Sequence, residues 1–312
     1  MTLPRTVIGC DIAKAKLDVY NAAGQTFDVV PNTPDDIANW TATLDASATL
    51  VVCEATGACD RALIHALEDR KIDCARVNPK RARDFARAAG VLAKTDRVDA
   101  RVLAEMGRRM ELRPDPAPSA ERMKITDLSV RRDQLVEIRK QERTRLTACH
   151  DACSRMSIES HIAWLDQEIE SLDRHIKSAI SASDEIRGSV RLLTSIPGIG
   201  AVAATVLVSQ MPELGQRSRR TIAALAGLAP INNDSGTFRG QRRIRGGRKR
   251  VRDALYMAAL SASRSSSNFA DFYQNRIANQ QPRKAAIIAL ARKILTVANA
   301  VIRDGKPFQN AT

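Results

Sequence analysis

The sequence predicts an α/β amino-terminal region followed by an all-α remainder. Three observations predict this division. Short apolar strands alternate with helical segments up to about residue 112, three prolines interrupt residues 112–121, and the segments beyond them have apolar residues at helical spacing. We therefore expect three regions, residues 1–112, 113–188 and 189–312.

The first region has the pattern of a mixed sheet flanked by helices. An apolar strand begins at Thr6 in TVIGCDIA, and a hairpin, KLDVYNAAGQTFDVV, turns near Ala23 and Gly24. Helices are expected in TPDDIANWTATL, in RALIHALEDR and after Pro79, with strands in ATLVVCEA and KIDCARVN. The resulting order is strand, strand, strand, helix, strand, helix, strand, helix. The ribonuclease H-like, or RuvC-like, fold has this order, but a fold alone establishes no activity.

The middle region is expected to contain two antiparallel helices, at about 121–150 and 158–182. The second has apolar residues every three or four positions, which is a heptad seam. These residues are Ile158, Ile162, Leu165, Ile169, Leu172 and Ile176. An intramolecular hairpin and a coiled-coil dimerisation arm both account for the pattern.

The last region is expected to be helical around a PGIG turn at residues 197–200, which separates two apolar helices. The turn resembles a helix-hairpin-helix motif, whose backbone amides can bind a DNA phosphate. Gly198 and Gly200 are therefore candidate nucleic-acid contacts. The alternative is a tight glycine turn that permits close helix packing.

The overall charge favours a polyanionic partner. Lys and Arg number 49 against 35 Asp and Glu, which gives a formal charge of +14, and nucleic acid is the expected ligand. No apolar run of membrane-spanning length and no signal peptide are recognised, so we expect no membrane association and a cytoplasmic location. The six cysteines include no CxxC pair, which argues against a zinc site and favours reduced, mostly buried thiols.

Four carboxylates indicate a metal centre. Asp11 lies within an apolar strand and Glu54 ends another, where an ionised carboxylate is costly unless it is paired. Asp96 and Asp99 are three residues apart in a predicted helix and share a face. Together the four could hold Mg²⁺, in a one-metal or two-metal site for phosphoryl transfer.

Each of these acids also has an explanation without metal. Asp11 could be a strand-end residue, Glu54 a helix cap, and the helical pair a solvated face. Asp18, Asp28 and Asp60 lie in alternating or polar surroundings, so we expect them to be solvent-exposed.

A strongly basic run follows Gly236. It contains eight basic residues and no acid up to position 252, and glycines at 240, 246 and 247 predict a flexible segment suited to phosphate neutralisation. The basic residues are Arg239, Arg242, Arg243, Arg245, Arg248, Lys249, Arg250 and Arg252. Ser235, directly before the run, is by itself an ordinary turn residue, since no nearby histidine could activate it.

Several blocks together resemble one family across nearly the whole chain. They are GCDIAKAKLDVY, VVCEATG, KTDRVDARVLA, IPGIG, GLAPINNDSGTFRG and RRIRGGRKRVRDALY. The chain resembles insertion-sequence transposases with a DEDD, RuvC-like domain and a carboxy-terminal domain with an essential serine, known as bridge-RNA-guided recombinases. The resemblance places the DEDD acids on Asp11, Glu54, Asp96 and Asp99, and the serine nucleophile on Ser235.

The family resemblance also implies a mechanism and partners. It implies Mg²⁺ in the first domain, protomer contacts through the coiled coil, and a covalent serine–DNA link. The active site would combine domains of two protomers in a homo-oligomer, a dimer or tetramer. A structured non-coding guide RNA would pair with the double-stranded DNA of element ends and target. The Arg-Gly-Gly-Arg run at 245–248 departs from the lysine and glycine–asparagine pair frequent in the family.

Two other functions remain open. A RuvC-like metal-dependent nuclease or junction resolvase would use the carboxylates alone to activate water, without a covalent intermediate. A non-catalytic RNA- or DNA-binding scaffold is the third possibility, but it would have no reason to place acids within apolar strands.

Overall fold

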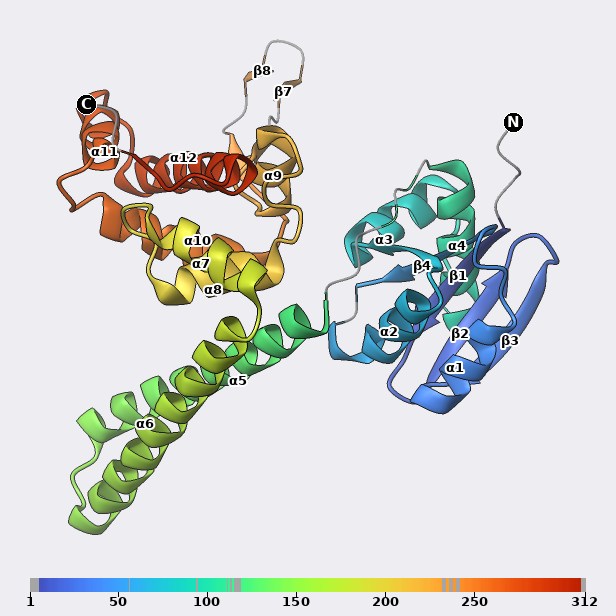
Figure 1. The fold of residues 1–312 in the computed structure, drawn as a ribbon, viewed down its shortest axis with the longest axis horizontal. Helices are drawn as coiled ribbons and strands as arrows, with labels where there is room; N and C mark the ends of the chain where they lie inside the picture. The colour runs from blue at the N-terminus through green and yellow to red at the C-terminus, as the bar shows by residue number, and fades with distance from the viewer. Residues whose placement is uncertain are drawn as a thin grey trace. The chain divides into compact units, whose positions relative to one another are not determined.

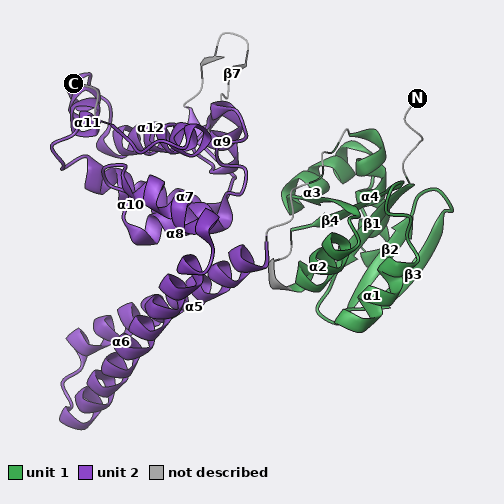
Figure 2. Cartoon of the chain, in the orientation of Figure 1, with its two compact units in different colours: residues 1–117 green, residues 118–312 purple. Residues whose placement is uncertain are grey.

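The computed structural model describes residues 6–55, 57–93, 95–110, 112, 114, 119–231, 234–235, 238–239 and 242–309. The chain forms two compact units, residues 1–117 and 118–312 (Figure 2). The boundary lies in the expected proline-rich stretch. The central helices group with the carboxy-terminal helices, because the base of the central pair contributes Ile125 and Ala179 to the core of the second unit.

Unit 1 is built on a five-stranded mixed sheet, as expected (Figure 1). Its strands are β1 (Thr6–Ile12), β2 (Lys16–Asn21), β3 (Thr26–Pro31), β4 (Thr49–Glu54) and β5 (Asp73–Val77). The sheet order is β3-β2-β1-β4-β5, with antiparallel pairing from β1 to β3 and parallel pairing from β1 through β4 to β5. The central strand β1 therefore lies between an antiparallel and a parallel neighbour.

Helices cover both faces of this sheet. They are α1 (Pro34–Ala42), α2 (Arg61–Asp69, after the 3-10 turn η1, Gly57–Asp60), α3 (Pro79–Ala88) and α4 (Asp96–Arg109). Ile8 and Cys10 of β1 pack in the core that includes α1 and α2, whereas Val7 packs in the core that includes α3 and α4. Because side chains alternate along a strand, the odd-numbered residues of β1, including Asp11, face α4.

Two glycines let α4 lie unusually close to the sheet. A Cβ atom at Gly9 would collide with the carbonyl oxygen of Ala100, and one at Gly107 would overlap the side chains of Val7 and Val52. Thus α4 runs antiparallel to β1, with its last turn over the start of the strand and its first turn toward the strand end.

Unit 2 begins with a long helical hairpin, α5 (Ala120–Ala148) and α6 (Ala152–Ser181) (Figure 1). Leu165 and Ile169 of the predicted seam are buried against Leu135, which confirms that the seam faces α5. The helix α6 begins at Ala152 rather than at 158, because the Asp151 side chain caps it by accepting a hydrogen bond from the Ser154 amide at 2.7 Å.

The rest of unit 2 is helical apart from short hairpin strands. The helices are α7 (Asp184–Thr194), α8 (Ala201–Gln210), α9 (Arg219–Leu225), α10 (Lys249–Ala262), α11 (Asn268–Ala278) and α12 (Arg283–Asp304). The strands are β6 (Pro230–Ile231), β7 (Asp234–Ser235), β8 (Phe238–Arg239) and β9 (Arg243–Ile244).

The helix α12 corrects the expectation that no apolar segment reaches membrane-spanning length. It has 22 residues, and among the described residues it alone meets the length and hydropathy of a spanning helix. Half of its apolar window is buried inside the protein, with Leu290, Ile294 and Ala298 in the core of unit 2. A core helix accounts for this composition.

Candidate active site and nucleic-acid interface

The close packing of α4 on β1 gathers acidic side chains at one end of β1. Asp96 and Asp99 belong to the first turn of α4, whose N-cap is Thr95, and this turn lies toward the end of β1 that carries Asp11. The charges of both helical acids act on Asp11. The structure therefore brings together three of the four predicted carboxylates.

A further acid joins this group. Asp18 of β2 lies directly opposite Asp11 in the antiparallel register and is only 3% exposed, so the expectation of solvent exposure was wrong. The reason is that α4 packs against β2 as well as β1. Sequence alternation did not reveal this, because Asp18 shares its face of β2 with Lys16 and Tyr20 rather than with Leu17 and Val19, which is the pattern of an exposed face.

The expectation for Asp60 was also wrong. Asp60 is 2% exposed and accepts a hydrogen bond from the Arg76 guanidinium at 2.8 Å. This buried ion pair joins the start of α2 to β5 on the far side of the sheet from α4, and it satisfies Asp60 internally. Asp28 is exposed, as expected.

The acids repel one another. Burial, followed by the nearby charges of Asp99, Asp96 and Asp18, together raises the pKa of the Asp11 carboxyl to about 6. The ammonium group of Lys16 lies 2.7 Å from Asp18 and 3.2 Å from Asp96. The Lys16 ammonium group thus lies between two of the acids and offsets part of their negative charge.

The fourth predicted acid, Glu54, ends β4. The parallel register pairs Cys10 with Cys53, so Asp11 and Glu54 are the next residues on adjacent strands. No group of three or more His, Cys, Asp or Glu in the described part of the chain is arranged to hold a metal ion. The donor set, carboxylate oxygens in excess over cations, nevertheless has the chemistry that Mg²⁺ prefers.

Ser235 lies in a small hairpin of unit 2. Its backbone belongs to β7 and pairs with Phe238 of β8, next to the Asp234 and Arg239 pair, so the residue is in a short strand rather than an irregular loop. A second strand pair, Pro230 with Ile244 and Ile231 with Arg243, joins β6 and β9 below it. The side chains of Ser235 and Arg239, and residues 236–237, lie outside the described part of the structure.

Glycines fix the base of this hairpin. Gly246 and Gly247 both have positive φ, at 71° and 69°, a conformation that favours glycine. A Cβ atom on Gly247 would collide with the backbone of Gly227, so the chain crosses itself there. These two residues were predicted to be flexible, but the close approach to Gly227 requires a glycine at position 247, and the positive φ favours one at position 246.

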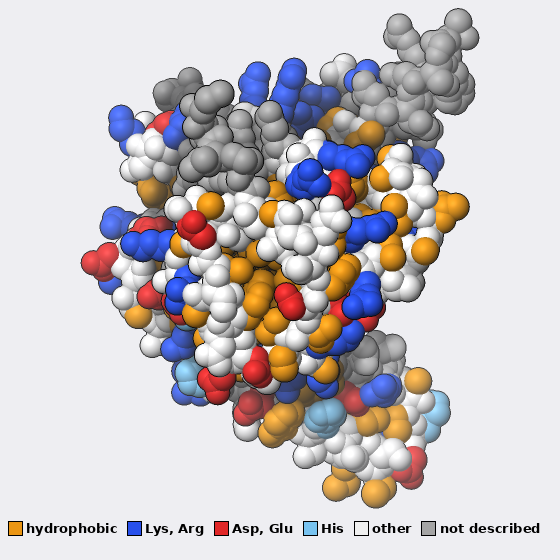
Figure 3. Space-filling view, turned by 90° about the vertical axis from the view of Figure 1, so that its right-hand side faces the viewer, with side chains coloured by type: hydrophobic (Ala, Val, Ile, Leu, Met, Phe, Trp, Pro, Cys, Tyr) orange, Lys and Arg blue, Asp and Glu red, His pale blue; other side chains and the backbone are white. Residues whose placement is uncertain are grey.

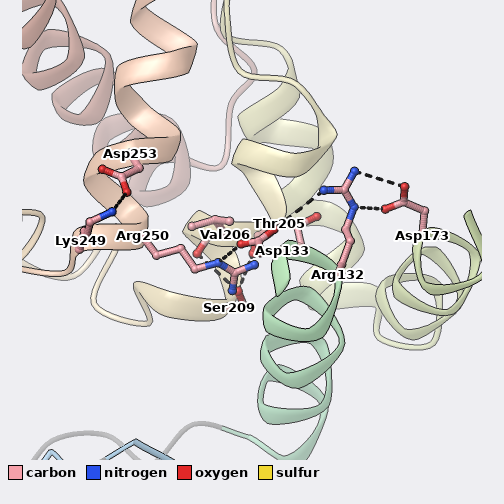
Figure 4. A network of polar contacts seen from close by, with 9 residues as sticks. All are labelled: Arg132, Asp133, Asp173, Thr205, Val206, Ser209, Lys249, Arg250 and Asp253. Carbon is pink, nitrogen blue, oxygen red and sulfur yellow. Dashed lines mark hydrogen bonds and ion pairs between the residues drawn. The ribbon is translucent and has the colours of Figure 1, made fainter. Parts of the chain in front are cut away.

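Part of the basic run is engaged within unit 2. Arg248 donates two hydrogen bonds to the buried carboxylate of Glu213, at 2.6 and 2.7 Å, while Arg250 donates to Asp133 of α5 at 2.7 Å. Lys249 pairs with Asp253 one helical turn later (Figure 4). These contacts tie the start of α10 to its surroundings.

Three other arginines of the run are exposed. Arg242, Arg243 and Arg245 are solvent-accessible around β9, and none has an acidic partner among the described residues. Lys and Arg side chains are also spread over the face shown in Figure 3, with acidic side chains among them. The three arginines at β9 therefore remain the strongest candidates in the run for phosphate contacts.

The PGIG turn connects α7 and α8 as expected. Gly198 has a φ of 89°, and a Cβ atom there would collide with the Ala258 carbonyl of α10, so close packing explains this glycine. Gly200 is the N-cap of α8 and has open space around its Cβ position. The amide end of α8 is thus the part of the motif that suits an anion.

Comparison with known proteins finds family models that match two parts of the chain. Residues 8–153 match a transposase model of the DEDD, IS110 type, and residues 190–274 match the description "Transposase IS116/IS110/IS902 family". The chain is 30% identical to the pilin gene-inverting protein of Moraxella lacunata, with 98% of both chains covered. It belongs to the IS116/IS110/IS902 family of transposases.

Other relatives agree with this assignment. The pilin gene-inverting protein of Moraxella bovis is 29% identical over 98% of both chains. An uncharacterised 43.6 kDa protein of insertion element IS110 from Streptomyces coelicolor is 29% identical, over 44% of this chain and 34% of its own length. As a transposase, the protein is an enzyme that cleaves and rejoins DNA, and its first domain is of the DEDD type.

Proposed function

We propose that this transposase cuts and rejoins DNA through a Mg²⁺-dependent carboxylate centre and a serine nucleophile. The metal-binding residues would be Asp11, Glu54, Asp96 and Asp99, and the nucleophile Ser235. The observation that carries the proposal is the glycine-dependent packing of α4 on β1, which gathers acids at the end of a buried strand. If α4 had only a structural role, gathering these acids would destabilise the fold without any benefit.

The carboxylates fit a divalent ion by charge and by donor type. When bound, Mg²⁺ would neutralise charge that develops on the phosphate during transfer. Lys16, which pairs with Asp18 and Asp96, would supply a further positive charge at the site. The strand order of unit 1 supports a RuvC-like assignment, since the expected alternation of strands and helices is present.

The serine would form the covalent link. Its oxygen would attack phosphorus, a bond from phosphorus to a DNA sugar oxygen would break, and the leaving oxygen would take up a proton as the serine loses one. The hairpin base supports this role, because the close approach of Gly247 to Gly227 and the Glu213–Arg248 pair fix the chain just after β9. The acids and the serine belong to different units, so a composite site from two protomers of a homo-oligomer agrees with the family resemblance.

The substrates follow from the family and its relatives. We propose that the DNA consists of element ends and a target, chosen by a structured guide RNA that pairs with both. The exposed arginines of β9 and the amide end of α8 would then contact phosphates rather than bases. The pilin gene-inverting relatives support site-directed rearrangement of a DNA segment as the outcome.

The test uses Ser235→Ala in the full-length protein, with Ser265→Ala as a matched control outside the hairpin. The variant should bind nucleic acid normally but lose both strand cleavage and a denaturation-resistant, protease-sensitive DNA adduct. If Ser235→Ala cleaves at the wild-type rate with Mg²⁺, water is the nucleophile and the resolvase alternative holds. That alternative has one favourable observation, since the acids gather without any contribution from unit 2.

A further inference from the structure

Unit 1 has a cleft of about 580 Å³ that the carboxylate centre does not use. It lies between the β2–β3 hairpin, the end of α3 and the exposed side of α4. Its lining combines the aromatic rings of Tyr20 and Phe85 with Arg101, Arg108 and Arg109 of α4. Aromatic rings beside arginines are the usual components of sites for unpaired nucleotides.

The aromatic content of this region is high for this chain. The whole protein has only six Phe, three Tyr and two Trp, yet Tyr20, Phe27 and Phe85 lie in or beside the cleft. Tyr20 and Phe27 are paired across β2 and β3, with ring centroids 4.9 Å apart. All three side chains are only half-buried, so part of each ring is accessible to a ligand.

The cations of the cleft are only partly neutralised. Arg101 of the lining is exposed without an acidic partner among the described residues. Outside the lining, the guanidinium of Arg97 lies over the Phe27 ring, 5.0 Å from its centroid. Glu105 is the one acid in the lining, and it pairs with both Arg108 and Arg109, at 3.0 and 3.1 Å. The cleft therefore keeps a net positive charge that suits phosphate.

The aromatic pair Tyr20 and Phe27 lies next to the carboxylate centre on the same face of the sheet. Tyr20 is two residues beyond Asp18 on β2, so the two share a sheet face and lie roughly 7 Å apart along the strand. On β3, Val29 lies opposite Asp18 and is 59% exposed. An accessible apolar and aromatic surface thus extends from the acids toward the cleft.

We infer that this surface binds a single-stranded nucleic-acid segment, with a base stacked on Tyr20 and Phe27 and a phosphate held by Arg97 and Arg101. Base faces are accessible in an unpaired strand but are covered in a duplex. The inference rests on the proposed function, since it supplies a holding site next to the phosphodiester that reacts at the acids. The strand is either opened DNA or an unpaired part of the guide RNA, which share this chemistry.

The test measures binding and photocrosslinking of short single-stranded oligonucleotides that carry 5-iodouracil, made as DNA and as RNA, to the full-length protein without divalent metal. Tyr20→Ala and Arg101→Gln should each weaken binding at least about fivefold and lower the crosslink yield. Tyr20→Phe keeps the ring, and Arg87→Gln removes an exposed arginine of α3 that is not in the lining. Both controls should bind like the wild type.

The outcomes separate this inference from the proposed function. Asp11→Asn should crosslink like the wild type even if it cannot cleave DNA. Arg101→Gln changes only a surface residue, and the folding of Tyr20→Ala can be checked separately. If both folded variants bind single strands normally, the cleft is not the site, whatever the cleavage assays show. A preference for the DNA or the RNA oligonucleotide identifies the strand, while equal displacement by duplex DNA would overturn single-strand selectivity.

Discussion

The pKa values of the buried carboxylates shift in opposite directions in the two units. In unit 1, burial and the charges of Asp99, Asp96 and Asp18 raise the pKa of Asp11 to about 6. In unit 2, burial opposes ionisation of Glu213, but the hydrogen bonds and charge of Arg248, a backbone hydrogen bond and the charge of Arg217 together outweigh it, and the pKa is lowered. Arg248 compensates the charge of Glu213, whereas the acids around Asp11 repel it. This contrast supports the cation site that we propose in unit 1 and a structural ion pair in unit 2.

The largest effect is expected at the acids of unit 1, which repel one another. Asp11→Asn or Asp99→Asn should reduce strand cleavage to an undetectable level, because each removes a proposed ligand charge but little volume. Nucleic-acid affinity, measured by gel shift, should stay within a few-fold. Asp28→Asn, an exposed carboxylate of β3, is the control and should cleave normally. Full cleavage by either ligand variant would remove the case for a carboxylate centre.

The paired carboxylate of unit 2 should affect stability instead. Glu213→Gln leaves the Arg248 guanidinium without its counter-charge and should lower the free energy of unfolding by about 2 to 3 kcal/mol. Asp253→Asn breaks the exposed pair with Lys249 and should change it by less than about 0.5 kcal/mol. Denaturant titration measures both. Equal effects would show that the Glu213 pair does not anchor the hairpin base.

The exposed part of the basic run should affect binding in a salt-dependent way. Replacing Arg242, Arg243 and Arg245 by Ala should weaken binding to all sequences alike. The slope of log affinity against log salt should flatten by up to about one unit per lost contact. Arg303→Ala, which removes an exposed arginine paired with Asp304, should leave the slope unchanged. An unaltered slope in the triple variant would show that these arginines do not contact phosphate.

The smallest effects should be opposite pH dependences in the two units. Since the folded pKa of Asp11 is raised, metal-free protein should lose stability as pH rises from about 3.8 through about 6, and Asp11→Asn should lack this loss. Since the folded pKa of Glu213 is lowered, its contribution is present above 4.5 and is lost as pH falls below it. Melting temperatures of wild type, Asp11→Asn and Glu213→Gln across pH 4 to 8 test both signs. Parallel curves for all three would contradict the comparison.

Local patterns in the sequence predicted most of the elements. The strands of unit 1, the proline-rich boundary, the seam of α6 and the helices around the PGIG turn all follow from periodicity and capping residues. Asp11 could be singled out as well, because a charge inside an apolar strand is anomalous without any tertiary information.

Only the tertiary structure decided which charged side chains lie close to other charged side chains. Sequence could not show that Asp18 joins the acids, because its burial comes from α4 crossing two strands at a distance that Gly9 permits. Nor could the sequence show which arginines of the basic run are paired within the fold. Glu213, the partner of Arg248, is 35 residues away in the chain, and Asp133, the partner of Arg250, is 117 residues away. Charge is a property of the residue, whereas its compensation depends on neighbours that folding brings from elsewhere in the chain.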